Sequence, residues 1–379
     1  MTDIQLLRNR VFILIFIGLL LIAARAEPCS TFLLKKNGIL LVGHNLDERA
    51  HVPGLVIINK RGIAKTSVSW ASLISGKPDS TPPLTWKSKY ASITFNAFGR
   101  DFPDDGINEK GLFIGEMTLQ ESRFPDNPAL PRIFMSLWMQ YVLDSFDDID
   151  QVIESASRLT IDGWGWHFFT ADSSGRAAAI EFLDGRVVVN QGENMPVPVL
   201  CNSQYEEELG NLSLYQSFGG NKPVSMDKQE TPRFVQAAWM LENFSPDKKE
   251  PVDYAFEILS QLERGGTQWS LVCDLKKQRV WFRSAASPKI KEICLKAFNP
   301  ECTEPVKFVD IHSDLEGDVS KDMDDYSYTA NRSFCEKAMK ALLKISPLFE
   351  KVVAMQGGTM DGLLERIATF PEKAICQHP

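Results

Sequence analysis

The chain has 379 residues, of which 44% are hydrophobic and 24% are charged, and its formal net charge is −8. This acidic balance argues against a nucleic-acid partner, because binding to a phosphate backbone needs a basic face. The length allows a large hydrophobic core and lies near the upper limit for a single domain.

Residues 1–26 have the layout of a secretory signal peptide. Arg8 and Arg10 lie in a polar start, an apolar run covers residues 11–24, and small residues stand at Ala24 and Ala26. The apolar run is shorter than the roughly 20 residues of a membrane-spanning helix. We therefore expect export to the periplasm or the extracellular space without stable membrane insertion, and a membrane anchor is the alternative.

Residues 30–47 predict a β-hairpin, because two apolar runs flank Asn37-Gly38. A two-residue turn there places Thr31 opposite His44 and, if the pairing continues, Cys29 opposite Leu46. Both strands are apolar on both faces, which is typical of strands covered on two sides. The segment around Cys29 should therefore be buried.

Later segments add strands and blocks of helix. Residues 167–189 predict three strands, and residues 267–284 predict a second hairpin. Helical periodicity appears in four further stretches before residue 270 and again over 331–370. The four stretches are residues 131–146, 147–158 with a cap at Ser145, 232–244 and 252–263. Antiparallel strands with helices grouped in blocks predict a layered α+β fold.

The residues that bind metals form no convincing site. The five histidines are scattered, no cysteine pair has C-x-x-C spacing, and we expect neither a metal nor another cofactor. Two acidic stretches, residues 101–105 and 314–325, lack the alternating ligand pattern of a calcium loop. We expect both to be solvated loops.

Cys29 is either half of a disulfide or a nucleophile. A cysteine attacks a carbonyl as a thiolate and needs a base. If Glu27-Pro28 were removed as a short propeptide, the α-amine of Cys29 would be that base, with a pKa near 7.7–8.0 when unperturbed. Asp47, brought close by the hairpin, would orient the amine. These residues alone leave both interpretations open.

Several motifs, in order along the chain, resemble those of the choloylglycine hydrolase family of N-terminal-nucleophile amidases, which includes penicillin V acylases and bile salt hydrolases. They are CSTF (29–32), GHNLD (43–47), GINEKGL (106–112), PVLCNSQYEEE (198–208), TPRFVQAA (231–238) and TQWSLVCDL (267–275). Each motif is weak by itself, but their order and spacing together are specific. The resemblance covers about residues 29–285.

The resemblance implies a four-layer αββα fold and hydrolysis of a linear carbon–nitrogen amide bond in a small N-acyl amide. It places the nucleophile at Cys29 and the catalytic aspartate at Asp47. It also places the oxyanion-site asparagine at Asn202 and the active-site arginine at Arg233. The amidase domain would cover residues 29–330.

The chain departs from the family pattern at three positions near the nucleophile. His44 replaces the usual arginine, and it either polarises the thiol, charged part of the time near neutral pH, or packs against Thr31. Thr118 stands where relatives carry a second oxyanion-binding group. Glu116, two residues earlier, either meets a polar or cationic substrate group or is an ordinary exposed strand glutamate.

Residues 331–379 have no clear counterpart in the family, and we expect a helical extension stapled by Cys335 and Cys376. An apolar cleft lined by Trp138, Trp164 or Trp269 would take the acyl group. The activity we expect first is a penicillin V acylase-like N-acyl amide hydrolase. The alternatives are a bile salt hydrolase and an inactive exported binding protein, and the sequence leaves open a dimer or a tetramer.

Overall fold

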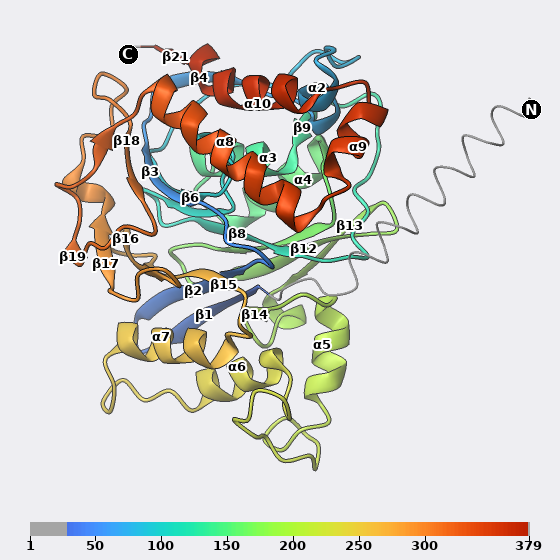
Figure 1. The fold of residues 1–379 in the computed structure, drawn as a ribbon. Helices are drawn as coiled ribbons and strands as arrows, with labels where there is room; N and C mark the ends of the chain where they lie inside the picture. The colour runs from blue at the N-terminus through green and yellow to red at the C-terminus, as the bar shows by residue number, and fades with distance from the viewer. Residues whose placement is uncertain (1–28, 378–379) are drawn as a thin grey trace, which may run out of the picture.

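The computed structural model describes residues 29–377 and shows four stacked layers in the order helix, sheet, sheet, helix (Figure 1). The predicted α+β fold of αββα type is therefore confirmed. The expected signal peptide and propeptide, residues 1–28, lie outside the described residues. Within residues 29–377, no helix has the length and apolar character needed to cross a membrane.

Two large sheets form the centre of the fold. The seven-stranded sheet contains, in spatial order, β14 (Val199–Leu200), β1 (Ser30–Lys36), β2 (Ile39–Asp47), β15 (Thr267–Asp274), β16 (Arg279–Ser284), β17 (Lys291–Cys294) and β19 (Gly317–Asp318). The nine-stranded sheet contains β13 (Arg186–Gln191), β12 (Ala177–Leu183), β11 (Trp166–Ala171), β8 (Phe113–Thr118), β7 (Asp105–Asn108), β6 (Ser92–Asn96), β3 (Leu55–Asn59), β18 (Lys307–Asp310) and β20 (Asp324–Asp325). Two small sheets complete the set, one of β10 (Thr160–Asp162) and β9 (Arg132–Phe134) and one of β21 (Ile375–Cys376), β4 (Ile63–Thr66) and β5 (Thr85–Lys87).

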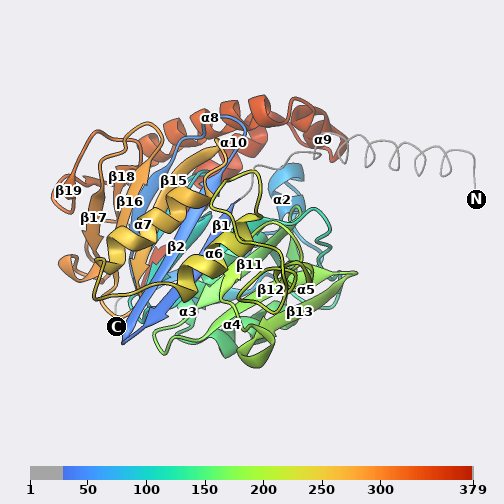
Figure 2. The same ribbon diagram turned by 90° about the horizontal axis from the view of Figure 1, so that it is seen from below.

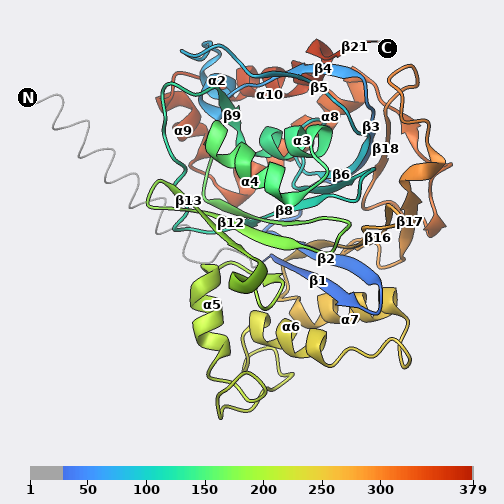
Figure 3. The ribbon, with the colours of Figure 1, turned by 180° about the vertical axis from the view of Figure 1, so that it is seen from behind.

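Helices cover the outer faces of both large sheets. The α-helices are α2 (Trp70–Ser75), α3 (Met135–Ser145), α4 (Ile149–Arg158), α5 (Tyr205–Leu212), α6 (Arg233–Glu242), α7 (Pro251–Leu262), α8 (Tyr328–Ile345), α9 (Phe349–Met355) and α10 (Met360–Thr369). Helices α6 and α7 pack on β1, β2 and β15 (Figure 2), and α3 and α4 pack on the nine-stranded sheet (Figure 3). Helices α8 to α10 lie on the same side of the nine-stranded sheet as α3 and α4, beside them (Figures 1 and 2).

The β1–β2 hairpin has the predicted register. Asn37 and Gly38 have φ angles of 49° and 82°, the left-handed pair that a tight hairpin turn requires. Thr31 lies opposite His44, and the ladder ends where Ser30 lies opposite Asn45. Between the sheets, Cys29 and Phe32 pack in one core with Phe95 and Met117 of the other sheet, so the start of the described chain is buried as predicted.

Two helix predictions need correction at their ends. Residues 132–134 were expected to be helical, but they form β9, which pairs in parallel with β10. Ser145 was expected to cap the next helix, but it is the last residue of α3. The cap of α4 is Asp148, whose side chain accepts from the Gln151 amide, because an aspartate at that position can satisfy the first free amides of the helix.

The first acidic stretch is not the solvated loop that we expected, since Asp101, Asp104 and Asp105 are at most 2% exposed. Lys65 Nζ lies 2.8 Å from Asp101 Oδ1, which compensates one of these charges. The C-terminal helices cover the segment, because the Asn331 side chain of α8 accepts from the Arg100 amide at 3.0 Å. Burial of this loop therefore depends on residues more than 200 positions away in the chain.

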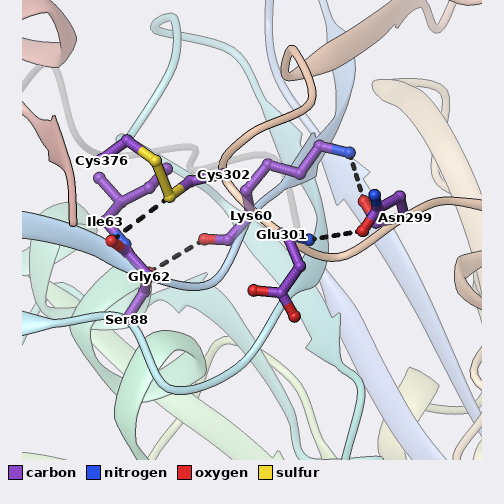
Figure 4. Close-up of a disulfide and its surroundings, with 8 residues drawn as sticks. All are labelled: Lys60, Gly62, Ile63, Ser88, Asn299, Glu301, Cys302 and Cys376. Atoms are coloured by element: carbon purple, nitrogen blue, oxygen red, sulfur yellow. Dashed lines mark hydrogen bonds between the residues drawn. A yellow bond between two sulfur atoms is a disulfide. The ribbon is translucent and has the colours of Figure 1, made fainter. Parts of the chain in front are cut away.

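Of the two cysteines expected to staple the helical extension, Cys376 forms a disulfide and Cys335 does not within residues 29–377. Cys376 is bonded to Cys302, as Figure 4 shows, because β21 pairs with β4 and carries Cys376 to the loop that holds Cys302. Cys335 is a free thiol buried on α8, where a Cβ added to Gly99 would lie only 2.6 Å from its sulfur. Cys335 therefore packs against the 97–105 loop instead of stapling the chain end.

Candidate active site

Cys29 lies at the start of β1, between the two sheets and 2% exposed. The end of β2 lies beside it, so that the Asp47 amide donates to Cys29 Sγ at 3.5 Å and the sulfur lies 3.8 Å from the Asp47 carbonyl oxygen. The tight turn at Asn37-Gly38 sets this contact, because it fixes which residues of the two strands meet. Cys29 and Asp47, predicted as nucleophile and orienting carboxylate, are thus brought together.

Arg233 reaches the same point from the other side. It is the first residue of α6, and its guanidinium donates to the Cys29 carbonyl oxygen at 2.6 Å and to the Ser30 hydroxyl. Its second terminal nitrogen donates to Asn202 Oδ1 at 3.0 Å. A guanidinium can hold three acceptors at once because its donors are fixed in a planar fork. Arg233 therefore fixes the backbone of the candidate nucleophile and the orientation of Asn202.

Asn202 follows β14, which pairs with β1 so that Leu200 lies opposite Thr31. Its Nδ2 donates to the Thr118 carbonyl oxygen at 2.7 Å. A side-chain amide has two N–H donors, so a second donor remains for a developing oxyanion. Thr118 takes part here through its carbonyl oxygen, which helps to hold Asn202 against β8.

His44 of β2 lies opposite Thr31 of β1. Among the hydrogen bonds of residues 29–377, none joins His44 to Cys29. Its Nδ1 lies 2.7 Å from Thr31 Oγ1, and the Thr31 hydroxyl donates to Met117 Sδ at 3.1 Å. Burial lowers the pKa of His44 to about 3. The expectation that His44 would be charged part of the time near neutral pH is therefore wrong, and the packing alternative describes its contacts.

Glu116 is 4% exposed, so it is not the ordinary exposed glutamate that we allowed for. Burial raises the pKa of its carboxyl well above the usual value, and the negative charges of Asp104, Glu48 and Asp105 raise the pKa further. The pKa of the Cys29 thiol is also raised, first by burial, then by the charges of Glu116 and Asp47. In the described part of the chain, this side of Cys29 therefore favours the neutral thiol.

The sequence missed Asp104 and Asp105, because their composition suggested a solvated loop. Asp105 Oδ2 accepts from the Trp269 indole at 3.4 Å and lies 3.7 Å from His44 Nε2. The signal that could have revealed them is that Asp105 begins, and Asp104 directly precedes, the buried strand that contains GIN of the GINEKGL motif.

The three tryptophans proposed for an acyl cleft lie in different places. Trp269 lies on β15 opposite Leu46, close to the site, and is fully buried. Trp138 is also fully buried but lies in the helical layer, where its indole donates to Ser155. Trp164 packs edge-to-face with Trp70 at 5.2 Å, in an aromatic cluster of that layer. Of the three, Trp269 alone packs in the same core cluster as Cys29.

A cavity of about 480 Å³ opens beside Arg233. Its lining includes Cys201, Tyr215 and Phe234 together with the basic side chains of Lys222, Lys228, Arg233 and Arg264 and the acidic side chains of Glu208 and Glu230. The cations outnumber the carboxylates, so this side of Cys29 is electropositive. The space suits part of a small molecule whose reactive bond lies at Cys29.

Comparisons with known proteins found a matching family model and a similar protein. The family model described as linear amide C–N hydrolases, choloylglycine hydrolase family, matches residues 29–308. The chain is 28% identical to penicillin V acylase from Pectobacterium atrosepticum over 261 residues, which is 57% of this chain and 69% of that protein.

Solved structures share the fold. Penicillin V acylase from Agrobacterium tumefaciens superposes with a TM-score of 0.69 at 21% identity, over 79% of this chain and 98% of that chain. A variant of conjugated bile acid hydrolase from Clostridium perfringens gives a TM-score of 0.60 at 19% identity, over 74% of this chain and 97% of that chain.

Proposed function

The chain belongs to the choloylglycine hydrolase family of linear amide C–N hydrolases, and on that premise we propose that it is an N-acyl amide hydrolase of the penicillin V acylase type whose nucleophile is Cys29. The observation that carries the proposal is that direct contacts connect four residues, Cys29, Asp47, Arg233 and Asn202. Asp47 contacts Cys29 Sγ, Arg233 binds the Cys29 carbonyl, and Asn202 binds Arg233.

In the proposed mechanism the working chain begins at Cys29, after loss of residues 1–28. The sulfur attacks the amide carbonyl while its proton moves to the α-amine of Cys29, which Asp47 orients. The free N–H of Asn202 stabilises the oxyanion. The α-ammonium then protonates the leaving amine as the C–N bond breaks, which leaves a thioester.

Water completes the cycle in the second half of the mechanism. The α-amine takes a proton from water, the hydroxide adds to the thioester carbonyl, and the C–S bond breaks to release the acid. The proton returns to the sulfur. The arrangement needs the amine as base, because His44 makes no hydrogen bond to Cys29 among the described residues and has a pKa of about 3.

We also propose export to the periplasm or the extracellular space. The apolar segment at residues 11–24 supports this, and so does the Cys302–Cys376 disulfide, because disulfides persist mainly in oxidising compartments.

Two measurements test the function. Mass spectrometry of the secreted protein should show a chain that begins at Cys29, whereas a chain that begins at Glu27 would favour an inactive binding protein. The processed protein is then assayed on phenoxyacetyl, phenylacetyl, long-chain acyl and glycocholate amides, with Cys29→Ser as a control. Hydrolysis of the aryl-acetyl amides, abolished in Cys29→Ser, supports the proposal. Hydrolysis of glycocholate alone would identify a bile salt hydrolase instead.

A further inference from the structure

Two carboxyl groups face each other at the β7–β8 edge, close to Cys29. Asp105 pairs with Gly115 in this ladder, so Asp104, one residue earlier, lies opposite Glu116, and the Glu116 amide donates to the Asp104 carbonyl oxygen at 3.0 Å. Residues directly opposite in an antiparallel ladder have Cβ atoms about 5 Å apart, and like charges there are destabilising. We call Asp104 and Glu116 the acidic pair.

Within residues 29–377, no lysine, arginine or histidine side chain compensates the acidic pair. Neither carboxyl forms an ion pair with a Lys, Arg or His in residues 29–377. The nearest candidates are engaged elsewhere, since Lys65 binds Asp101 and Asp144, and the Arg100 guanidinium lies over the Tyr326 ring.

The two members differ in how well their oxygens are satisfied. Asp104 Oδ2 accepts from the Ala97 amide at 2.6 Å. Among the described residues, no group forms a hydrogen bond with Glu116 Oε2, which is buried. An unpartnered carboxylate oxygen at such a buried position is costly, which points to a ligand that supplies the missing donor.

The acidic pair lies next to the reacting groups. Met117 Sδ accepts a hydrogen bond from the Thr31 hydroxyl, and the Thr118 carbonyl accepts one from Asn202. The two residues after Glu116 therefore contact Thr31 of β1 and Asn202 of the site. Figure 1 shows β8 where the nine-stranded sheet faces β2. Of the side chains that raise the pKa of the Cys29 thiol, Glu116 has the largest effect.

We propose that the acidic pair, with the half-buried Glu48 beside it, binds an organic cation carried by the substrate, so that the natural substrate is an N-acyl amide with an ammonium or guanidinium group close to the scissile bond. This inference rests on the proposed function and names its substrate class. An organic cation fits better than a metal ion, because no group of three or more His, Cys, Asp or Glu within residues 29–377 has the arrangement of metal ligands.

The charge distribution around Cys29 fixes the orientation of such a substrate. The cavity beside Arg233 is electropositive and repels a cation, whereas the acidic pair on the other side attracts one. A bound cation would also remove part of the negative potential that disfavours the thiolate. The substrate would thus help to activate the nucleophile that cleaves it, in addition to being held in place.

The test uses amides of matched length with the processed wild-type protein. The cation on the amine side is carried by N-phenylacetyl-1,4-diaminobutane, with N-phenylacetyl-pentylamine as neutral and N-phenylacetyl-5-aminopentanoate as anionic partner. The cation on the acyl side is carried by 5-aminopentanoyl-pentylamide, with hexanoyl-pentylamide as its neutral partner. We expect kcat/KM to favour one cationic amide over its neutral partner by about 10- to 100-fold, the range of a hydrogen-bonded charge. Equal rates for cationic and neutral partners on both sides would overturn the inference.

Variants of the acidic pair sharpen the result. In Glu116→Gln and in Asp104→Asn, the ratio of kcat/KM for the cationic and neutral amides should fall at least about tenfold. The control is Glu350→Gln, an exposed glutamate of α9, which should keep the wild-type ratio. An unchanged ratio in both acidic-pair variants would contradict the proposal.

Binding separates failure of this inference from failure of the proposed function. Isothermal titration calorimetry with Cys29→Ala protein compares the same cationic and neutral amides without turnover. If wild type hydrolyses none of the amides, the proposed function fails, and about tenfold tighter binding of the cationic amide still supports the cation site. If neutral amides are hydrolysed but cations gain nothing in rate or in binding, the function stands and the cation site is rejected.

Discussion

The two sides of Cys29 differ in charge and in how their polar groups are satisfied. On one side, the Arg233 guanidinium binds the Cys29 carbonyl, the Ser30 hydroxyl and Asn202, and Asn202 in turn binds Thr118. On the other side, Asp104 and Glu116 face each other without a cation from residues 29–377, and one carboxylate oxygen has no partner. The first side is a fixed framework for the reaction, and the second is complete only when something binds.

The two sides also depend on different parts of the chain. The Arg233 side is built by the hairpin, β14 and α6, all within the residues that the family model matches. The acidic side depends on the 97–105 loop, which is held by Lys65 of β4 and by Asn331 of α8. Lys65 lies inside the matched region and Asn331 lies beyond it, so part of the support for the acidic side comes from outside the family match.

The largest expected effect concerns the Arg233 side. Arg233→Met should lower kcat for any accepted amide by about 10²- to 10³-fold, because it removes the group that orients the oxyanion donor and holds the nucleophile. Steady-state kinetics on one neutral and one cationic amide measures this, and both rates should fall together. The control is Arg332→Met, an exposed arginine paired with Glu365, which should keep full activity. A loss confined to the cationic amide would reverse the roles assigned to the two sides.

The second prediction tests how the acidic side is supported. The Cys302–Cys376 disulfide joins residues 74 positions apart and ties β21 to the loop that holds Cys302, and β21 pairs with β4, the strand that carries Lys65. Cys302→Ser with Cys376→Ser should lower the free energy of unfolding by about 2–5 kcal/mol. Urea denaturation measures the loss, and amide hydrogen exchange locates it.

Exchange in the disulfide variant should increase in residues 97–105 more than in the β1–β2 hairpin. The matched control replaces a free thiol away from that loop, Cys294→Ser on β17, which leaves the disulfide intact. Uniform acceleration in both segments would show that the two sides of Cys29 are not independently supported.

How much of this could be predicted depended on the distance between interacting residues. The Asn37-Gly38 turn determined the Thr31–His44 pairing and the contact of Cys29 with Asp47, because a two-residue turn leaves one register. The meeting of Asn202 and Arg233 at Cys29 followed only from the family resemblance, since no local rule joins residues so far apart.

The acidic side was not predictable for a physical reason. Residues 101–105 have the composition of a solvated loop, and their burial depends on Asn331, Lys65 and the aromatic contact of Phe102 with Phe370. The pairing of Cys302 with Cys376 could not be predicted for a similar reason, because it follows from the pairing of β21 with β4. Each of these facts depends on tertiary contacts that the sequence pattern does not encode locally.

The third prediction concerns pH. Burial and the charge of Glu48 raise the pKa of Asp104 to about 7, so the folded protein keeps a proton that the unfolded chain loses near pH 4. This contribution to stability is complete below about pH 4 and is lost as the pH rises towards 7. His44, with its pKa lowered to about 3, acts in the opposite sense, since its contribution is lost as the pH falls below about 6.5.

The variant Asp104→Asn isolates the contribution of Asp104 to the pH dependence of the free energy of unfolding. Between pH 5 and pH 8 the free energy of unfolding of wild type should fall by about 2 kcal/mol relative to that of Asp104→Asn, which keeps an acceptor for the Ala97 amide. Urea denaturation at both pH values measures the difference, with the exposed Asp247→Asn as control. Parallel behaviour of wild type and Asp104→Asn would mean that the acidic side is already compensated.

The smallest effect comes from the remote support of the acidic side. Asn331 is 2% exposed, its Oδ1 accepts from the Arg100 amide at 3.0 Å, and its Nδ2 donates to the Ala368 carbonyl at 3.1 Å. Asn331→Ala should lower the free energy of unfolding by about 1–3 kcal/mol, because it leaves two buried backbone groups without partners. The matched control is Asn243→Ala, which also changes the asparagine of an N-x-S sequence. Asn243 is exposed, and its Nδ2 donates to the Trp239 carbonyl one helical turn earlier. This control should change the free energy of unfolding by less than about 0.5 kcal/mol. Thermal and urea denaturation of both variants measure the difference.

Asn331→Ala should also affect substrate preference. We expect the ratio of kcat/KM for cationic and neutral amides to fall about two- to fivefold, because a loosened 97–105 loop holds Asp104 less firmly. The effect is small because distant residues couple weakly. An unchanged ratio with lowered stability would show that α8 supports the fold without influencing the acidic side of Cys29.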